Sequence, residues 1–327
     1  NEQAGWIGGF DVVLGNPPWE QIQFDAREFF ATRHPEIAAA PHMAARNRMI
    51  DQLKETDPAL HAAYRAQVRI NEGIQHFIHN SGRYPLTSYG RLNSAPLFAE
   101  LARWVVAPSG RVGLIVPTGI ATDSFNQFFF RDLIETGSLV SLYDFENREG
   151  IFPAVHRSYK FCLLTLAGSA RPSSAPADFV FFAHHVDDLR DDERRFTLTA
   201  EDLALLNPNT RTCPIFRSRR DAELTKAIYR RVPVLVNESQ GDEGNPWGFQ
   251  GLLMFMMNTS SHLFRTRTEL EAEGWRLEGN VFVRGDERYL PLYEAKMLHQ
   301  FDHRWATYEG LDTRDMTAQE KDDPTAV

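Results

Sequence analysis

The ten residues Phe10 to Trp19, FDVVLGNPPW, decide the fold class of this chain. Residues 10–14 are a short run of apolar residues interrupted only by one aspartate, which is typical of a buried strand. Gly15 then links this run to Asn16-Pro17-Pro18-Trp19. Two successive prolines fix the backbone and carry no N–H group, so they form a stiff loop and leave their carbonyls free to accept hydrogen bonds. The stretch therefore predicts a strand that ends in a rigid, acceptor-rich loop.

The residues after this loop alternate between helical and strand patterns. Residues 25–80 carry apolar side chains at helical spacing, broken by prolines, and predict an insertion of several helices. A helix over 95–106 leads through a turn at 107–110 into a strand over 111–117. A helix over 125–135 and strands at 139–145, 159–166 and 179–182 follow. Strands that are apolar on both faces belong in a covered sheet, so we predict the α/β class: a partial Rossmann-like sheet with a helical insertion, followed by a mixed α+β segment.

The composition excludes several classes of protein. With 327 residues, of which 43% are hydrophobic, the chain can bury a sizeable core over about two domains. Its formal net charge of −9 provides no general basic field, so any contact with DNA has to be local. Two cysteines, Cys162 and Cys213, are too few for a disulfide framework or a four-thiolate metal site and favour a reducing compartment. We therefore expect a cytoplasmic protein without a metal. The most apolar run, residues 251–257, is far shorter than the roughly 20 residues of a membrane span, so we expect no membrane partner.

The loop Asn16 to Trp19 carries groups that suit an amine on a flat ring. Ligands of α/β sheets bind at the carboxyl ends of parallel strands. The Asn16 side-chain oxygen and the Pro17 carbonyl provide two acceptors for the two hydrogens of an exocyclic amine. Trp19 provides a stacking surface, which offsets on the order of 1–3 kcal/mol of the cost of flipping a base out of a duplex. Two such hydrogen bonds draw the amine nitrogen towards sp³ geometry, which makes its lone pair available to an electrophilic methyl group. The alternative is a rigid strand-to-helix turn with a buried tryptophan.

FDVVLGNPPW resembles the catalytic motif of amino-methyltransferases that use S-adenosylmethionine, specifically the DNA adenine-N6 group, in which Asn-Pro-Pro precedes Tyr, Phe or Trp. Further segments are similar to the Eco57I-like methylases of restriction-modification and phage-defence systems. These segments are GRLNSAPLF (Gly90–Phe98), GRVGLIVPTGIATD (Gly110–Asp123), FENREGIFPAVHRSYKFCLLTL (Phe145–Leu166) and YLPLYEAKMLHQFDHRWATY (Tyr289–Tyr308).

The resemblance implies a site-specific DNA methyltransferase that transfers a methyl group from S-adenosylmethionine to the N6 amine of a flipped adenine in double-stranded DNA. Asn16 and Pro17 would bind the amine within the motif that Pro18 completes, and Trp19 would stack on the base. The resemblance also implies a second aromatic side chain from the loop before the strand at 159–166. Phe152 is the first choice and Tyr159 the second, and core packing is the alternative role for both.

The cofactor-binding half of such enzymes is not evident in the sequence. It normally has a glycine-rich turn that opens a helix, followed by an acidic residue for the ribose, whereas the glycines of residues 5–9 precede a strand. The resemblance therefore implies that the cofactor-binding segment lies upstream, as a partner of this chain, and that the isolated fragment is inactive. In this scheme residues 1–170 are the C-terminal half of the methyltransferase domain, and residues 171–327 lead to target recognition.

Two other functions stay open. The same loop could present the side-chain amide of a protein glutamine or the amine of an RNA guanine, although the long helical insertion argues against those compact enzymes. The chain could also be a non-catalytic subunit for DNA recognition or assembly that keeps the fold. Binding of S-adenosylmethionine separates this last function from the others, because a scaffold needs no cofactor.

Overall fold

The computed structural model describes residues 8–253, 255–256, 259–292, 295–309 and 312–323. The chain divides into two compact units, Asn1–Phe249 and Gln250–Val327. Within the described residues, none of the helices combines the length and the apolar character needed to cross a membrane.

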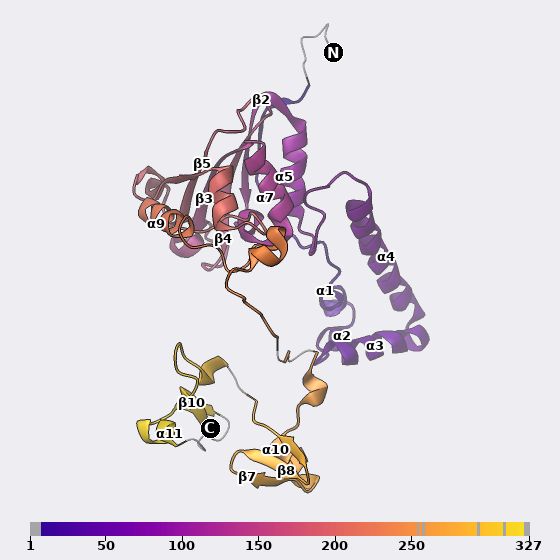
Figure 1. Cartoon of the computed structure of the whole chain (residues 1–327). Coiled ribbons are helices and arrows are strands. Elements are labelled where there is room, and N and C mark those ends of the chain that lie inside the picture. The colour runs from indigo at the N-terminus through magenta and orange to yellow at the C-terminus, as the bar shows by residue number, and fades with distance from the viewer. Residues whose placement is uncertain (1–7, 254, 257–258, 293–294, 310–311, 324–327) are drawn as a thin grey trace. The chain divides into compact units, whose positions relative to one another are not determined.

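The first unit is built on a six-stranded mixed sheet (Figure 1). Its order is β1-β2-β4-β3-β5-β6, with β1 Phe10–Gly15, β2 Val106–Val116, β3 Leu139–Glu146, β4 Lys160–Ala167, β5 Ala177–Ala183 and β6 Phe196–Leu198. β1 pairs in parallel with β2, and β3 with β5, whereas β4 lies antiparallel between β2 and β3. Strands β1, β2, β3 and β5 therefore point the same way. Their carboxyl ends and the amino end of β4 share one edge of the sheet, which we call the carboxyl edge.

Helices cover one face of this sheet and bury the main core. They are α5 Ser94–Val105, α7 Gln127–Glu135, α8 Ala200–Leu206 and α9 Arg219–Tyr229, with the short α6 Gly119–Thr122 after β2. Ala99, Phe129, Leu203 and Ala222, one from each longer helix, pack in the same apolar cluster as alternate residues of β2 (Figure 1). Short 3-10 helices lie in the connections: η2 Ser124–Asn126, η3 Asn147–Glu149, η4 Val186–Arg190 and η5 Glu238–Gly244.

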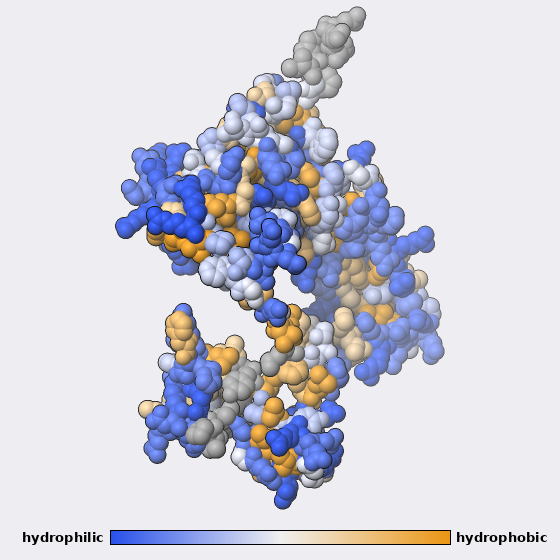
Figure 2. Space-filling view, viewed as in Figure 1, coloured by the Kyte–Doolittle hydropathy of each residue, from blue (hydrophilic) through white to orange (hydrophobic). Residues whose placement is uncertain are grey.

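The predicted helical insertion is confirmed. It consists of α1 Ala26–Ala31, α2 Pro35–Ala38, α3 Met43–Thr56 and α4 Pro58–Asn80. Phe30, Ile37, Ile50 and Leu53 form a core of its own. Arg46 is buried beside this core and donates to the carbonyls of Ile37, Ala38 and Ala40 at the end of α2. The outer surface of α3 and α4 is largely hydrophilic (Figure 2).

The predicted α/β class is also confirmed, and β5 and β6 carry the same sheet past residue 170. The predicted turn at 107–110 is wrong, because β2 continues through it. Phe10 pairs with Val106 and Val12 with Arg111, so the residues between them form a bulge opposite β1. Gly110 permits this, since a Cβ there would lie 2.7 Å from the Phe10 carbonyl oxygen.

The second unit has a mixed composition of short elements, as the sequence predicts for the last part of the chain. They are η6 Ser261–Leu263, α10 Arg267–Ala272, the antiparallel strands β7 Arg276–Glu278, β8 Val281–Arg284 and β9 Glu287–Tyr289, η7 Ala295–Met297, the pair β10 Ala306–Glu309 and β11 Asp312–Asp315, and α11 Ala318–Asp322. The buried Trp275 packs edge-on against Tyr289, and the Arg284 guanidinium lies 4.3 Å from its ring centre.

A buried carboxylate joins three strands close to the carboxyl edge. Asp144 of β3 accepts a hydrogen bond from the Thr118 hydroxyl, which follows β2, and another from the Phe182 backbone N–H of β5 at 3.0 Å. The Asp144 side chain is fully enclosed, and this burial raises the pKa of its carboxyl, although both hydrogen bonds oppose the shift. The loops that leave β2, β3 and β5 are thus held in register by one side chain.

We expect Asp144→Asn to be at least as stable as the wild type at about pH 7.5. The amide keeps both contacts, because its oxygen accepts from Phe182 and its nitrogen donates to Thr118. Since the folded pKa of Asp144 is raised, wild-type stability falls as pH rises above roughly 3.9, the unfolded-state value. The advantage of the asparagine variant in urea unfolding should therefore shrink at about pH 4.5.

The control is Asp144→Ala, which leaves two buried donors without an acceptor. It should lose about 1–3 kcal/mol of unfolding free energy. An asparagine variant as unstable as the alanine variant, or an advantage that does not change with pH, would contradict this role of the carboxylate.

Candidate active site

The loop Asn16 to Trp19 lies at the carboxyl edge, directly after β1. The Asn16 side chain is exposed, Pro17 is half-buried and Pro18 is exposed. Within the described part of the chain, neither the Asn16 amide nor the Pro17 carbonyl takes part in a side-chain or loop hydrogen bond. The two groups expected to bind an amine are therefore available to a ligand.

The same loop is fixed from behind by the amino end of α5. The Ser94 hydroxyl donates to the Pro18 carbonyl at 2.7 Å, and the Asn93 side-chain amide donates to the Trp19 carbonyl at 3.2 Å. The Asn93 side-chain oxygen also accepts from the Ala95 N–H and so caps α5. Ser94 and Asn93 therefore bond the carbonyls of Pro18 and Trp19, whereas the Pro17 carbonyl stays free. The loop is thus held at Pro18 and Trp19, while the Asn16 amide and the Pro17 carbonyl keep no such partner in the described part of the chain.

Trp19 has a structural role in addition to any contact with a ligand. Its indole Nε1 donates to the Ile115 carbonyl of β2 at 3.2 Å. The half-buried ring packs against the main core and also against a second apolar cluster on the other face of the sheet. Ring packing and this hydrogen bond fix the orientation of the indole.

Phe152 belongs to that second cluster, together with Trp19, Phe145 and Phe161. Its ring packs edge-on against Phe161, with 5.0 Å between ring centres. The fold thus brings the two predicted aromatic side chains, 133 positions apart in the sequence, into one cluster at the carboxyl edge. Tyr159 is 57% exposed and does not join the cluster.

Sequence reasoning missed Asn147, which shapes the loop between β3 and β4. Its side chain is fully buried and makes three hydrogen bonds within this loop. The amide nitrogen donates to the carbonyls of Phe152 at 3.0 Å and Val155 at 2.9 Å, and the amide oxygen accepts from the Phe152 N–H at 2.9 Å. Its backbone N–H also bonds the Tyr159 carbonyl, which closes the loop. An asparagine followed three residues later by a glycine, Gly150, which adopts φ +74°, was the available signal for a compact turn.

Glu146 holds the base of the same loop. Its carboxylate lies 2.8 Å from Arg148, 3.0 Å from Lys160 and 3.1 Å from His184, so it connects the ends of β3, β4 and β5. Burial acts to raise the pKa of Glu146, but the hydrogen bonds from Lys160 and His184 outweigh it and lower the pKa. The carboxylate is therefore ionised at neutral pH and serves as a structural anchor.

Other kinds of catalytic chemistry find little support. No group of three or more His, Cys, Asp or Glu side chains that could hold a metal ion occurs among the described residues. Cys162 and Cys213 are buried, and burial raises the pKa of both thiols. A protonated, enclosed thiol is a poor nucleophile.

We expect Asn147→Ala to loosen the loop that carries Phe152, because three buried hydrogen bonds are lost. Amide hydrogen exchange in residues 150–158 should accelerate, while exchange in α7 stays at the wild-type rate. The comparison variant Asn147→Asp keeps the size but places a carboxylate oxygen against the Phe152 and Val155 carbonyls, so exchange should accelerate at least as much as in the alanine variant. Unchanged exchange in the alanine variant would show that the loop is held by other contacts.

No family model matches the chain, and no curated protein sequence is similar to it. Solved structures that resemble part of it include the methyltransferase subunit of a type I restriction-modification system from Streptococcus thermophilus, at 13% identity and a TM-score of 0.31, over 42% of this chain and 33% of that one. The ATP-dependent Type ISP restriction-modification enzyme LlaBIII bound to DNA matches at 10% identity and a TM-score of 0.30, over 53% of this chain and 10% of that one. A complex of DrdV with DNA matches at 11% identity and a TM-score of 0.31, over 58% of this chain and 17% of that one. The chain thus spans a third or less of each of these proteins.

Proposed function

We propose that this chain is the base-binding half of a DNA adenine methyltransferase of a restriction-modification or phage-defence system. The reaction is transfer of a methyl group from S-adenosylmethionine to the N6 amine of an adenine flipped out of double-stranded DNA, in the cytoplasm. Asn16 and Pro17 bind the amine, and Trp19 and Phe152 enclose the ring.

One observation carries this proposal. The Asn16 amide and the Pro17 carbonyl are free acceptors on an anchored loop, and two aromatic side chains from separate loops pack in one cluster beside it. An exocyclic amine has two hydrogens to donate, and a flat ring has faces that stack on aromatic side chains. The site matches both properties of adenine at once.

Catalysis by these residues is mainly positioning. Two acceptors hold the amine hydrogens and direct the nitrogen lone pair away from the ring plane. Aromatic walls exclude water from the base. The amine would need no deprotonation before attack: as its bond to the methyl carbon forms, the methyl–sulfur bond would break and S-adenosylhomocysteine would leave, and the methylated nitrogen would then lose its extra proton to water.

The glycine-rich candidate turn gives no support to a site for S-adenosylmethionine within this chain. Gly8 and Gly9 lead directly into β1 and open no helix. Gly9 packs against the backbone of β2, where a Cβ would lie 2.6 Å from the Ala107 nitrogen. The remaining glycine of the predicted candidate turn, Gly5, lies outside the described residues. We therefore propose that another segment holds the methyl donor.

The exposed face of β1 supports the proposal of a partner segment. β1 is an edge strand, and Phe10, Val12 and Leu14 on one of its faces are 62%, 68% and 83% exposed. Apolar side chains on an open edge strand are a liability unless another element covers them. We propose that the cofactor-binding segment adds a strand beside β1 and covers this face. We also propose that residues 1–170 form the C-terminal half of the methyltransferase domain and that residues 171–327, which begin with the last two strands of the sheet, lead to target recognition.

The test expresses the full-length gene product that contains this chain in a host without adenine methylation. Host DNA is digested to nucleosides and N6-methyladenine is measured by mass spectrometry. We expect modification with the wild type and a loss of about a hundredfold or more with Asn16→Ala, the scale for removing one preorganised hydrogen-bonding group.

Trp19→Phe is the matched control, because it keeps a stacking ring and should retain part of the activity. If the wild type binds S-adenosylmethionine but leaves DNA unmodified, the DNA assignment is wrong and a protein glutamine or RNA guanine amine becomes the substrate. If it does not bind S-adenosylmethionine at all, the chain is a non-catalytic subunit.

A further inference from the structure

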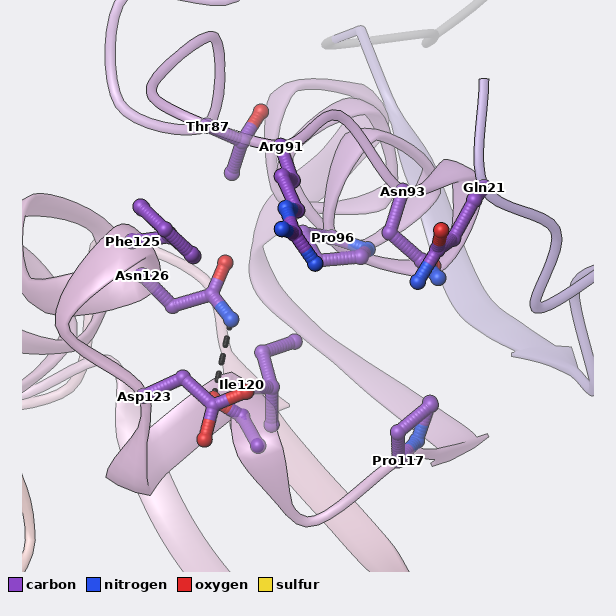
Figure 3. Close-up of a pocket in the computed structure, with 11 residues that line it drawn as sticks. Gln21, Thr87, Arg91, Asn93, Pro96, Pro117, Ile120, Asp123, Phe125 and Asn126 are labelled. Atoms are coloured by element: carbon purple, nitrogen blue, oxygen red, sulfur yellow. Dashed lines mark hydrogen bonds between the residues drawn. The ribbon is translucent and has the colours of Figure 1, made fainter. Parts of the chain in front are cut away.

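A polar pocket of about 260 Å³ lies beside the loop Asn16 to Trp19, which we call the anchored loop (Figure 3). Three segments form it: the chain just after Trp19, the connection that leads into α5 together with the first turn of that helix, and the segment after β2. Its lining comprises Gln21, Thr87, Arg91, Asn93, Pro96, Pro117, Gly119, Ile120, Asp123, Phe125 and Asn126. Its volume suits a single small ring system and is below that of most sites for drug-sized ligands.

Two close approaches at glycines shape the walls of this pocket. Gly90 has φ +58°, and a Cβ there would lie 2.0 Å from the Phe125 ring. A Cβ at Gly119 would lie 2.4 Å from a carboxylate oxygen of Asp123. The position of Arg91 next to Gly90 and the position of the Asp123 carboxylate therefore both depend on a missing side chain.

The polar groups of the pocket divide into those that hold the fold and those that are free. Asn93 holds the Trp19 carbonyl, and the Asn126 amide donates to the Gly119 carbonyl at 2.9 Å. The side chains of Arg91 and Gln21, in contrast, make no hydrogen bond or ion pair within the described part of the chain. Figure 3 shows the Arg91 guanidinium directed into the pocket. The Asp123 carboxylate accepts only a 3.4 Å contact from the Thr122 hydroxyl.

The lining offers a ligand both a cation, Arg91, and an anion, Asp123, and both side chains are exposed to solvent. A lone phosphate would pair with Arg91 but would be repelled by the negative charge of Asp123. A metal ion would pair with Asp123 but would be repelled by the positive charge of Arg91. The floor includes Pro96, Pro117 and Ile120, which suit an apolar ring. Guanine offers two acceptors, O6 and N7, that a guanidinium binds bidentately, and it offers N1–H and N2–H donors for a carboxylate.

We infer that this pocket binds an unstacked guanine base, with Arg91 on O6 and N7 and Asp123 on the N1 and N2 hydrogens. The site is separate from the proposed adenine site and does not depend on methyl transfer. Because Asn93 contacts both the pocket and the Trp19 carbonyl, a guanine bound here lies next to the anchored loop.

The test measures binding of nucleotides to this 327-residue chain by calorimetry. The probes are deoxyguanosine monophosphate, its 7-deaza analogue without the N7 acceptor, deoxyinosine monophosphate without the N2 amine, and deoxyadenosine monophosphate. We expect deoxyguanosine monophosphate to bind about tenfold or more tightly than the adenine nucleotide. The wild type should bind the 7-deaza and inosine analogues more weakly than deoxyguanosine monophosphate. Arg91→Ala should abolish the difference in affinity for the 7-deaza analogue, and Asp123→Asn should abolish the difference for the inosine analogue.

Arg69→Ala is the matched control, since Arg69 is an exposed arginine on α4. A single-stranded oligonucleotide with one guanine, compared with the same strand carrying adenine, distinguishes a DNA base from a free nucleotide as the source. Equal affinity for the guanine and adenine nucleotides, complete competition by inorganic phosphate, or an Arg91→Ala variant that binds like the control would overturn the inference. Asn16→Ala should leave guanine binding unchanged, so failure of the methyltransferase proposal is recognised separately.

Discussion

The shared direction of β1, β2, β3 and β5 is the constraint on which the rest of the structure depends. It brings the loops after these strands, and the loop before β4, to one edge of the sheet. Two carboxylates fix this edge in different ways. Asp144 is enclosed and bonds neighbouring strands through a hydroxyl and a backbone N–H, whereas Glu146 is held ionised by surrounding cations. Asp144 bonds one side chain and one backbone N–H, and Glu146 pairs with three side chains, so each links residues from more than one strand end.

In the loop Asn16 to Trp19, some hydrogen-bond acceptors hold the fold and others are free. Ser94 and Asn93 occupy the carbonyls on the side of α5, while the Asn16 amide and the Pro17 carbonyl remain free. A loop with unsatisfied acceptors is costly unless it stays in contact with water or a ligand, which explains why the exposed Asn16 lies at the end of an edge strand. Trp19 stands between two apolar clusters and links this loop to Phe152. If the loop binds an amine and Trp19 stacks on its ring, both contacts depend on the same packing.

Local sequence pattern was sufficient for the strand at residue 10, the helical insertion and the position of the rigid loop, because each depends on residues close together in the chain. It was not sufficient where partners are distant. The antiparallel placement of β4 depends on pairing with β2 and β3, and the bulge at 107–110 depends on the opposing β1. Asn147 and Asp144 acquire their roles only from buried contacts. The assignment of Phe152 and of the four loop residues to catalysis stays a prediction.

The most direct measurement of the central claim compares two nucleosides that differ only in the amine. Saturation-transfer NMR would measure the affinity of this chain for 2′-deoxyadenosine and for purine 2′-deoxyriboside, in the wild type and in Asn16→Ala. If Asn16 and Pro17 bind the amine, the wild type prefers deoxyadenosine and the variant loses most of that preference, because one of the two acceptors is gone. Equal affinities in the wild type, or a preference that survives in the variant unchanged, would contradict the account.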